Sequence, residues 1–267
     1  MTSRKISVVR YALAVALIFG WEFSSRYKLV DPVFIPLPSR ILATIAQQWQ
    51  RGELKQHTWL STERALGGFL VACVVGSLLG LAIGGTWPRL ATALEPTAEL
   101  CAQANPVVLF HVVLLFFGIG ESSKIFVIAW MCTWPIMWSA IGGIQQVDPE
   151  LVRLARSFGL SGASLVWKCL LPASIPSILT GMRLSGGYAF IMLIATEMMG
   201  TSSGLGWFVV QSQESYHAER IFAGASIITT LALTLDWFLK RFEAQLIHWK
   251  PTFDERRILI EDVVGNT

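Results

Sequence analysis

The sequence predicts an all-α integral membrane protein with six transmembrane helices. Of its 267 residues, 53% are hydrophobic and only 15% are charged, whereas a soluble domain carries about 25% charged residues. The charges are also segregated, and uncharged runs of 24, 21 and 23 residues cover 65–88, 100–120 and 125–147. Each run exceeds the ~18 residues that indicate a membrane-spanning helix. Backbone groups in lipid must be paired within their own segment, which favours helices.

The elements are expected in the following order. The first span, at 8–24, follows three basic residues as a signal peptide would, but the bulky Trp21-Glu22-Phe23 makes no cleavage site, so we expect it to be retained. A helix from Arg40 to Arg51, with Ser39 as N-cap, is expected on the membrane surface or against the first span. Within a single domain, 1–267, the other predicted spans cover 63–86, 100–118, 124–146, 175–199 and 221–242.

Basic residues indicate the orientation. With six spans both termini share a side, and if that side is the cytoplasm, 13 of the 21 Lys and Arg residues lie inside. The sequence therefore predicts cytoplasmic termini and a cytoplasmic loop at 148–172. The net charge of +3 then reflects topology and gives no indication of nucleic-acid binding.

The loop at 148–172 is a polar island between two apolar stretches, and it has the composition of two short helices. Arg153, Arg156 and Lys168 make it basic, Gly159 ends the first helix, predicted from Pro149 to Phe158, and a proline opens the next apolar stretch. One interpretation is a surface that a cytoplasmic partner grips. The other is an ordinary loop whose charges only fix orientation.

This loop resembles the EAA loop of binding-protein-dependent ABC transporter permeases, which reads Glu-Ala-Ala, three residues, Gly, nine residues, Ile-x-Leu-Pro. The spacing from the glycine to the proline is intact. The strict matches are Ala155, Gly159, Leu171 and Pro172, and the departures are Arg153, Leu154 and Cys169. The segments 117–126, 147–150, 175–183 and 203–206 look like the sulfonate/nitrate/taurine branch of these permeases.

The resemblance implies a type I ABC importer permease fold in the bacterial inner membrane. It implies a path for a small organic or inorganic anion such as a sulfonate, taurine or nitrate; related permeases carry thiamine-precursor pyrimidines or riboflavin, which is the alternative. The implied partners are two ABC ATPase subunits, which use the ATP and Mg, a second permease copy in a homodimer, and an external solute-binding protein. The implied ATPase-coupling residues are Glu150, Arg153, Leu154, Ala155, Arg156, Phe158, Gly159, Leu160 and Pro172.

Polar residues inside the spans are candidates for the solute path. His111 faces either the path or a packed neighbour, and Asn105-Pro106 before it predicts a kink in the same helix. Thr196 and Glu197 end the fifth span and either gate the path or are solvated at the interface.

Two further features have two interpretations each. Arg183 pairs with Asp236 or contacts solute. The tryptophans at 130, 134 and 138 form a stripe that packs at a subunit interface or lines the path.

The chain carries no ATPase motif. The sequence lacks the phosphate-binding loop, so ATP hydrolysis must come from a separate subunit. An intramembrane enzyme such as a lipid-modifying transferase is the alternative from another class, and the loop spacing argues against it. The four cysteines show no paired spacing and are interpreted as packing residues: Cys73, Cys101, Cys132 and Cys169.

Overall fold

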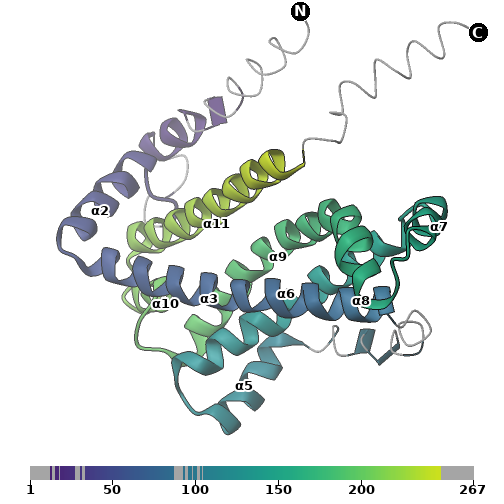
Figure 1. The fold of residues 1–267 in the computed structure, drawn as a ribbon. Coiled ribbons are helices and arrows are strands. Elements are labelled where there is room, and N and C mark those ends of the chain that lie inside the picture. The colour runs from purple at the N-terminus through teal and green to yellow at the C-terminus, as the bar shows by residue number, and fades with distance from the viewer. Residues whose placement is uncertain are drawn as a thin grey trace, which may run out of the picture.

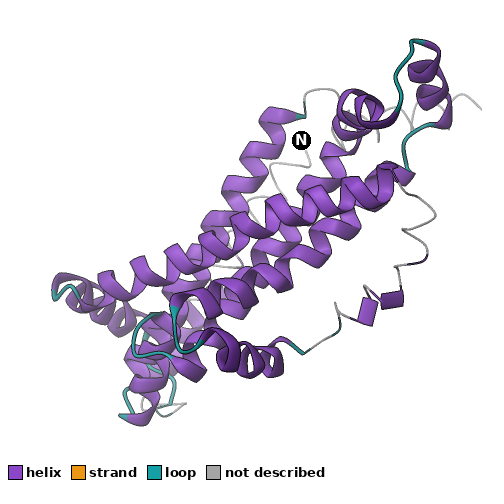
Figure 2. Cartoon of the chain, turned by 60° about the horizontal axis from the view of Figure 1, so that its bottom comes forward, coloured by secondary structure: helices purple, strands orange, loops and turns teal. Residues whose placement is uncertain are grey.

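The computed structural model shows a bundle of helices (Figure 1). It describes residues 13, 16–17, 19–27, 31, 34–86, 93, 96–97, 99–100, 103 and 105–247. Within these residues it contains helices and loops and no strand (Figure 2), as the sequence predicts.

Four helical segments of the described chain are long and apolar enough to cross a membrane. They are α3 (Glu53–Leu81) with the π-helical turn Ala82–Thr86, α6 (Glu121–Gln145), α9 (Leu171–Gly200) preceded by α8 (Gly162–Leu165) and the π-helical turn Val166–Leu170, and α11 (Ala218–Leu246). The shorter helices are α2 (Pro38–Gln50), α5 (Pro106–Phe117), α7 (Pro149–Ser157) and α10 (Leu205–Glu214).

The predicted spans at 63–86, 124–146, 175–199 and 221–242 lie in these long segments to within one residue. The span predicted at 100–118 differs, because its described helix, α5, has only 12 residues. At 1.5 Å per residue α5 is about 18 Å long, shorter than the ~30 Å hydrocarbon core. Nine of the 17 residues of the span predicted at 8–24 are described, and these nine are helical.

The predicted kink at Asn105-Pro106 is a helix start in the structure. The Asn105 side chain accepts a hydrogen bond from the amide of Val107 at 3.0 Å, and Pro106 is the first helical residue. Proline is well suited to this position because the amide it lacks would have no partner within the helix.

The predicted cap of α2 is also different. Leu37 occupies the N-cap position, and Ser39 lies inside the helix. The amide and hydroxyl of Ser39 donate to the carboxylate of Glu22 at 3.1 and 2.8 Å. Glu22 lies in the helical residues 19–26. Its carboxylate therefore caps the start of α2 by accepting a backbone amide, and it joins the two helices.

The core forms where α6 packs against α3 and α9. Glycines let α3 approach α6 closely. A Cβ at Gly68, Gly76 or Gly80 would clash, because it would lie 2.5–2.8 Å from atoms of α6. Gly143 and Gly181 do the same between α6 and α9, where an added Cβ would meet serine Cβ atoms at 2.7 and 2.6 Å. Small residues at helix contacts are the usual means of close packing in membranes.

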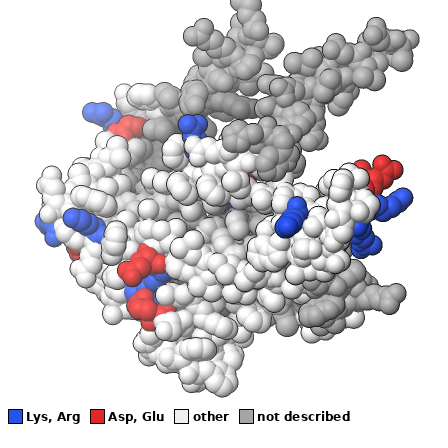
Figure 3. Space-filling view, in the orientation of Figure 1, with Lys and Arg blue, Asp and Glu red and all other residues white. Residues whose placement is uncertain are grey.

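The outer surface of the bundle is apolar. Side chains such as Leu70, Val74, Leu233 and Phe238 are each about 60% exposed. Figure 3 shows the charged side chains gathered at a few places, with broad uncharged surface between them. Such a surface suits contact with lipid or with another apolar chain.

Adjacent glycines of α6 provide a test of this packing. We expect Gly143→Ala to lower the thermal unfolding temperature of the purified protein, because the new methyl would lie 2.7 Å from Ser177 Cβ. Gly142→Ala is the matched control, since no atom lies within 4 Å of its added Cβ. It should leave the unfolding temperature unchanged or raise it, because alanine favours a helix over glycine by up to ~1 kcal/mol of unfolding free energy. Equal effects of the two substitutions would contradict the close contact of α6 with α9.

Candidate functional site

The two ends of the bundle carry different chemistry. Helix α7 lies at one end (Figure 1), close to where α6 finishes and the segment leading into α9 begins. Because α3, α6 and α9 are long and packed together, the start of α6 lies at the opposite end, with the finish of α9. We call the end with α7 the loop end and the other the distal end.

The local sequence explains why α7 begins and ends where it does. The Asp148 side chain accepts from the amide of Glu150 at 2.8 Å, and Pro149 is the first helical residue. After Phe158, Gly159 adopts φ +81° and its amide donates to Arg156, while the amide of Leu160 donates to Ala155. This pair of bonds is a Schellman motif, which favours glycine at the left-handed position.

Most of the predicted coupling residues are accessible at the loop end. Ala155 is buried and anchors α7, and Leu160 is partly buried. The other predicted residues are exposed: Glu150, Arg153, Leu154, Arg156, Phe158, Gly159 and Pro172.

Helix α7 therefore presents apolar and basic side chains together. Leu154 and Phe158 are 54% and 77% exposed, and Leu151 is 46% exposed. Exposed apolar side chains beside Arg153 and Arg156 have the composition of a protein-docking surface. We call these five residues the loop-end surface.

A cluster of charged residues occupies the distal end, and Glu197 alone among its members was a predicted site residue. Arg64 of α3 is 2% exposed, and all five of its N–H groups donate hydrogen bonds. Two go to Glu121 at the start of α6, one goes to Glu197 near the end of α9 at 2.8 Å, and two go to Ser203. One guanidinium thus joins three helices and the loop before α10. Lys124 completes the cluster, since its ammonium donates to Glu121 at 2.9 Å. We call Arg64, Glu121, Lys124 and Glu197 the distal network.

Glu197 is sealed inside the protein. Its carboxylate also accepts from the hydroxyl of Ser61 at 2.8 Å and from the amide of Gly206 at 2.9 Å. The segment 203–206 reaches it only because it is rich in glycine: a Cβ at Gly204 would lie 2.3 Å from the Glu197 carboxylate, and one at Gly206 would lie 2.7 Å from the Glu197 Cβ. The expectation that Glu197 is solvated at the interface is wrong, because the residue is 1% exposed.

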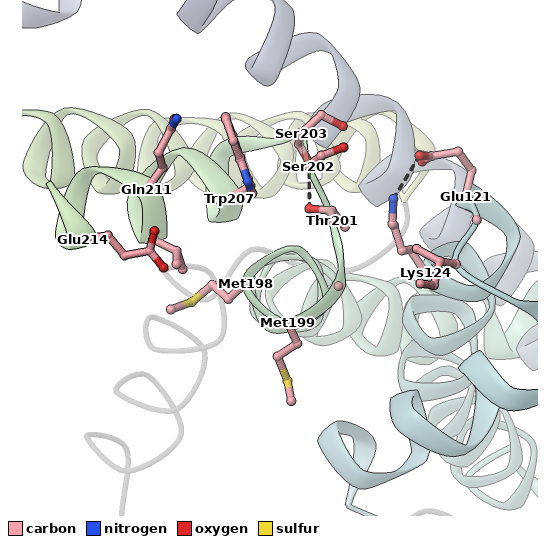
Figure 4. A pocket seen from close by; sticks show the side chains of 14 residues that line it. Glu121, Lys124, Met198, Met199, Thr201, Ser202, Ser203, Trp207, Gln211 and Glu214 are labelled. Carbon is pink, nitrogen blue, oxygen red and sulfur yellow. Dashed lines mark hydrogen bonds and ion pairs between the residues drawn. The ribbon is translucent and has the colours of Figure 1, made fainter.

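A cavity of about 720 Å³ opens beside the distal network. Figure 4 shows Glu121 and Lys124 on one side of it, Trp207, Gln211 and Glu214 from α10 on another, and Met198 and Met199 at the end of α9. Polar side chains and apolar ones thus share its lining.

The four residues predicted to line the solute path belong to two separate elements. Asn105 and His111 belong to α5 and its cap; His111 is exposed, and its Nδ1 lies 2.9 Å from the carbonyl oxygen of Val107. Thr196 is buried and donates to Leu193, and Glu197 belongs to the distal network. Their role in a solute path stays a prediction.

Of the two features with open interpretations, Arg183 is paired within the chain, and the role of the tryptophan stripe stays a prediction. Arg183 lies 3.7 Å from Asp236, as one interpretation predicts, and 3.0 Å from Glu243. Trp130 and Trp134 meet edge to face with ring centres 5.3 Å apart.

The two arginines differ in burial and provide a test of the distal network. We expect Arg64→Gln to destabilise the protein by about 3–5 kcal/mol, because it leaves Glu197 buried without its cation. Arg183→Gln is the comparison, since that side chain is 34% exposed and its pairs are worth about 1 kcal/mol or less. Thermal unfolding of both purified variants measures the difference, and similar losses would contradict a sealed distal network.

Comparisons with known proteins agree with this architecture. The family model described as "Binding-protein-dependent transport system inner membrane component" matches residues 66–248. The taurine transport system permease protein TauC of Escherichia coli is 31% identical over 92% of this chain and 91% of its own length. The putative aliphatic sulfonates transport permease protein SsuC of Bacillus subtilis is 29% identical over 91% and 87%, and the nitrate import permease protein NrtB of Synechocystis is 29% identical over 70% and 68%.

Solved structures share the fold. A chain of the MetNI methionine ABC transporter in an inward-facing conformation aligns with a TM-score of 0.62 at 15% identity, covering 74% of this chain and 98% of that one. The family match, the relatives and the apolar helices lead to one conclusion: the chain belongs to the inner membrane components of binding-protein-dependent transport systems, and it is the permease subunit of an ABC importer, with the ATPase as a separate subunit.

Proposed function

We propose that this permease forms the path for a small anion with a sulfonate- or nitrate-like group, delivered by an external binding protein. The carrying observation is the shared chemistry of the relatives, whose names specify taurine, aliphatic sulfonates and nitrate. Each of these solutes presents several oxygen atoms that share negative charge. Such a group is recognised by fixed N–H donors and cations.

The loop-end surface supports a coupling role for α7. A helix held at both ends by its cap and its Schellman motif can transmit a push without unwinding. Its exposed Leu154 and Phe158 would enter a groove of the ATPase, and Arg153 and Arg156 would contact the rim of that groove. We infer that closure of the ATPase dimer around ATP and Mg moves α7, and that α7 moves α6 and α9 with it.

We further infer a homodimer of permeases, two ATPase subunits and cytoplasmic termini. One copy has too few spanning helices to enclose a solute path of useful width, so a second copy is needed. The exposed apolar side chains of the bundle are compatible with such a contact. The orientation that puts α7 in the cytoplasm also agrees with the distribution of basic residues along the chain.

The solute class is tested with a reconstituted complex. The permease, its ATPase and its binding protein are placed in liposomes, and ATP-dependent uptake is measured for taurine, an alkanesulfonate, nitrate, a thiamine-precursor pyrimidine and riboflavin. We expect uptake of at least one of the anions and none of the two ring compounds. Uptake confined to the pyrimidine or riboflavin would overturn the anion proposal.

The coupling role is tested at Gly159. We expect Gly159→Val to assemble normally and to lose solute-stimulated ATP hydrolysis at least about tenfold, because a β-branched residue resists the φ of +81° that ends α7. Gly159→Asn is the matched control, since asparagine tolerates this backbone region, and it should keep most of the stimulation. Wild-type stimulation in the valine variant would show that the end of α7 takes no part in coupling.

A further inference from the structure

We propose that the distal cavity is a binding site for a monovalent oxyanion, which takes the place of the Glu121 carboxylate on Arg64 and Lys124. The proposal rests on the anion transport proposed above and assigns it a site. It follows from the unequal burial of the four charges in the distal network.

The two carboxylates of the network are held differently. The Glu197 side chain is fully buried, and it is fixed by Ser61 and Gly206 as well as by Arg64. The Glu121 side chain is 57% exposed. Among the described residues, its hydrogen-bond partners are the two cations alone, Arg64 and Lys124. Glu121 is therefore the member of the network that can leave.

The two cations are fixed and sealed. The side chains of Arg64 and Lys124 are 3% and 6% exposed, so neither follows a departing carboxylate into water. Without Glu121, two positive charges face the single negative charge of Glu197, which leaves a net charge of +1. A buried net charge is unfavourable unless a counter-charge replaces the one removed.

The freed donors match an oxyanion. Glu121 takes two parallel N–H groups of Arg64 and one of Lys124, and planar guanidinium groups bind carboxylate, sulfonate and similar oxygen pairs in this two-pronged way. A monovalent anion restores neutrality, which a divalent one does not. The adjoining cavity of about 720 Å³ has room for such an anion and for an attached organic group beside Trp207 and the methionines.

The same cavity contains a matched control. Glu214 also lines it, but no Lys or Arg of the described residues pairs with Glu214. Glu121→Gln and Glu214→Gln remove the same charge from the same cavity. Only the first frees the donors of Arg64 and Lys124.

The test is the thermal unfolding of the assembled complex, without binding protein, in methanesulfonate. Chloride at equal ionic strength is the control anion, because it is monovalent but has no pair of oxygen atoms. We expect Glu121→Gln to reach half of its stabilisation at an at least about tenfold lower methanesulfonate concentration than wild type or Glu214→Gln, because a neutral amide competes less well than a carboxylate for the two cations. Adding Lys124→Gln to Glu121→Gln should remove this gain. Equal responses of Glu121→Gln and Glu214→Gln, or a gain that survives the loss of Lys124, would overturn the proposal.

A second measurement keeps the wild-type network and decides the matter if Glu121→Gln fails to assemble. Ser202 is exposed and lines the cavity. In Ser202→Cys, methanesulfonate should slow alkylation of that cysteine by N-ethylmaleimide, read by mass spectrometry, and chloride should not. Equal alkylation in both salts would overturn the site.

The outcome is separable from that of the proposed function. A complex that imports a sulfonate but shows neither effect would retain the transport function and lose this site. A complex that imports no anion but shows both effects would retain the site and lose the transport proposal.

Discussion

The close contact of α6 with α3 and α9 is the constraint on which the rest of the molecule depends. Glycines on all three helices remove side chains from the contact. The helices are so close that a Cβ added at these glycines would clash with the neighbouring helix. In lipid, helices gain little from hiding apolar side chains, and tight packing has to supply the stability. The resulting unit extends from one end of the bundle to the other. A movement of the helices at the loop end can therefore be transmitted to the distal end.

At the distal end this packing makes a buried charge network possible. Arg64, Glu121 and Glu197 come from three different helices, and their mutual hydrogen bonds require all three helix ends to lie together. The Ser203–Gly206 segment adds backbone groups to the same site, and its glycines let those groups approach Glu197. Charges inside a membrane protein are costly and tend to serve function. A network with one exposed carboxylate on two sealed cations is suited to exchange that carboxylate for a solute anion.

At the loop end the physical logic is different. Helix α7 is fixed by local bonds: a side-chain cap at its start, a left-handed glycine at its end and one buried alanine. Little of its surface is used inside the chain, and the apolar residues it exposes are available to another protein. A locally stable helix with an uncommitted surface is well suited to carry motion between two subunits.

Much of the architecture could be predicted because it depends on local chemistry. Uncharged runs longer than ~18 residues indicate spanning helices whatever their neighbours, and four of the predicted spans lie in long apolar helices. The end of α7 at Gly159 was also predictable, because a left-handed residue favours glycine regardless of tertiary contacts. By contrast, α5 is shorter than its uncharged run, because Asn105 and Pro106 start a helix there rather than bend one.

The class of the protein, its long helices and the spacing of its loop follow from residues that are near one another in the chain. The distal network instead depends on how the helices pack. Arg64 and Glu197 are 133 positions apart, and nothing local to either residue specifies the other as its partner. The segment 203–206 is a recognisable motif in the sequence. Its contact with Glu197, through the backbone amide of Gly206 and the absence of side chains at its glycines, is visible only in the structure. Burial and pairing of charges are properties of the packed helices, so they could not be predicted from the order of the residues.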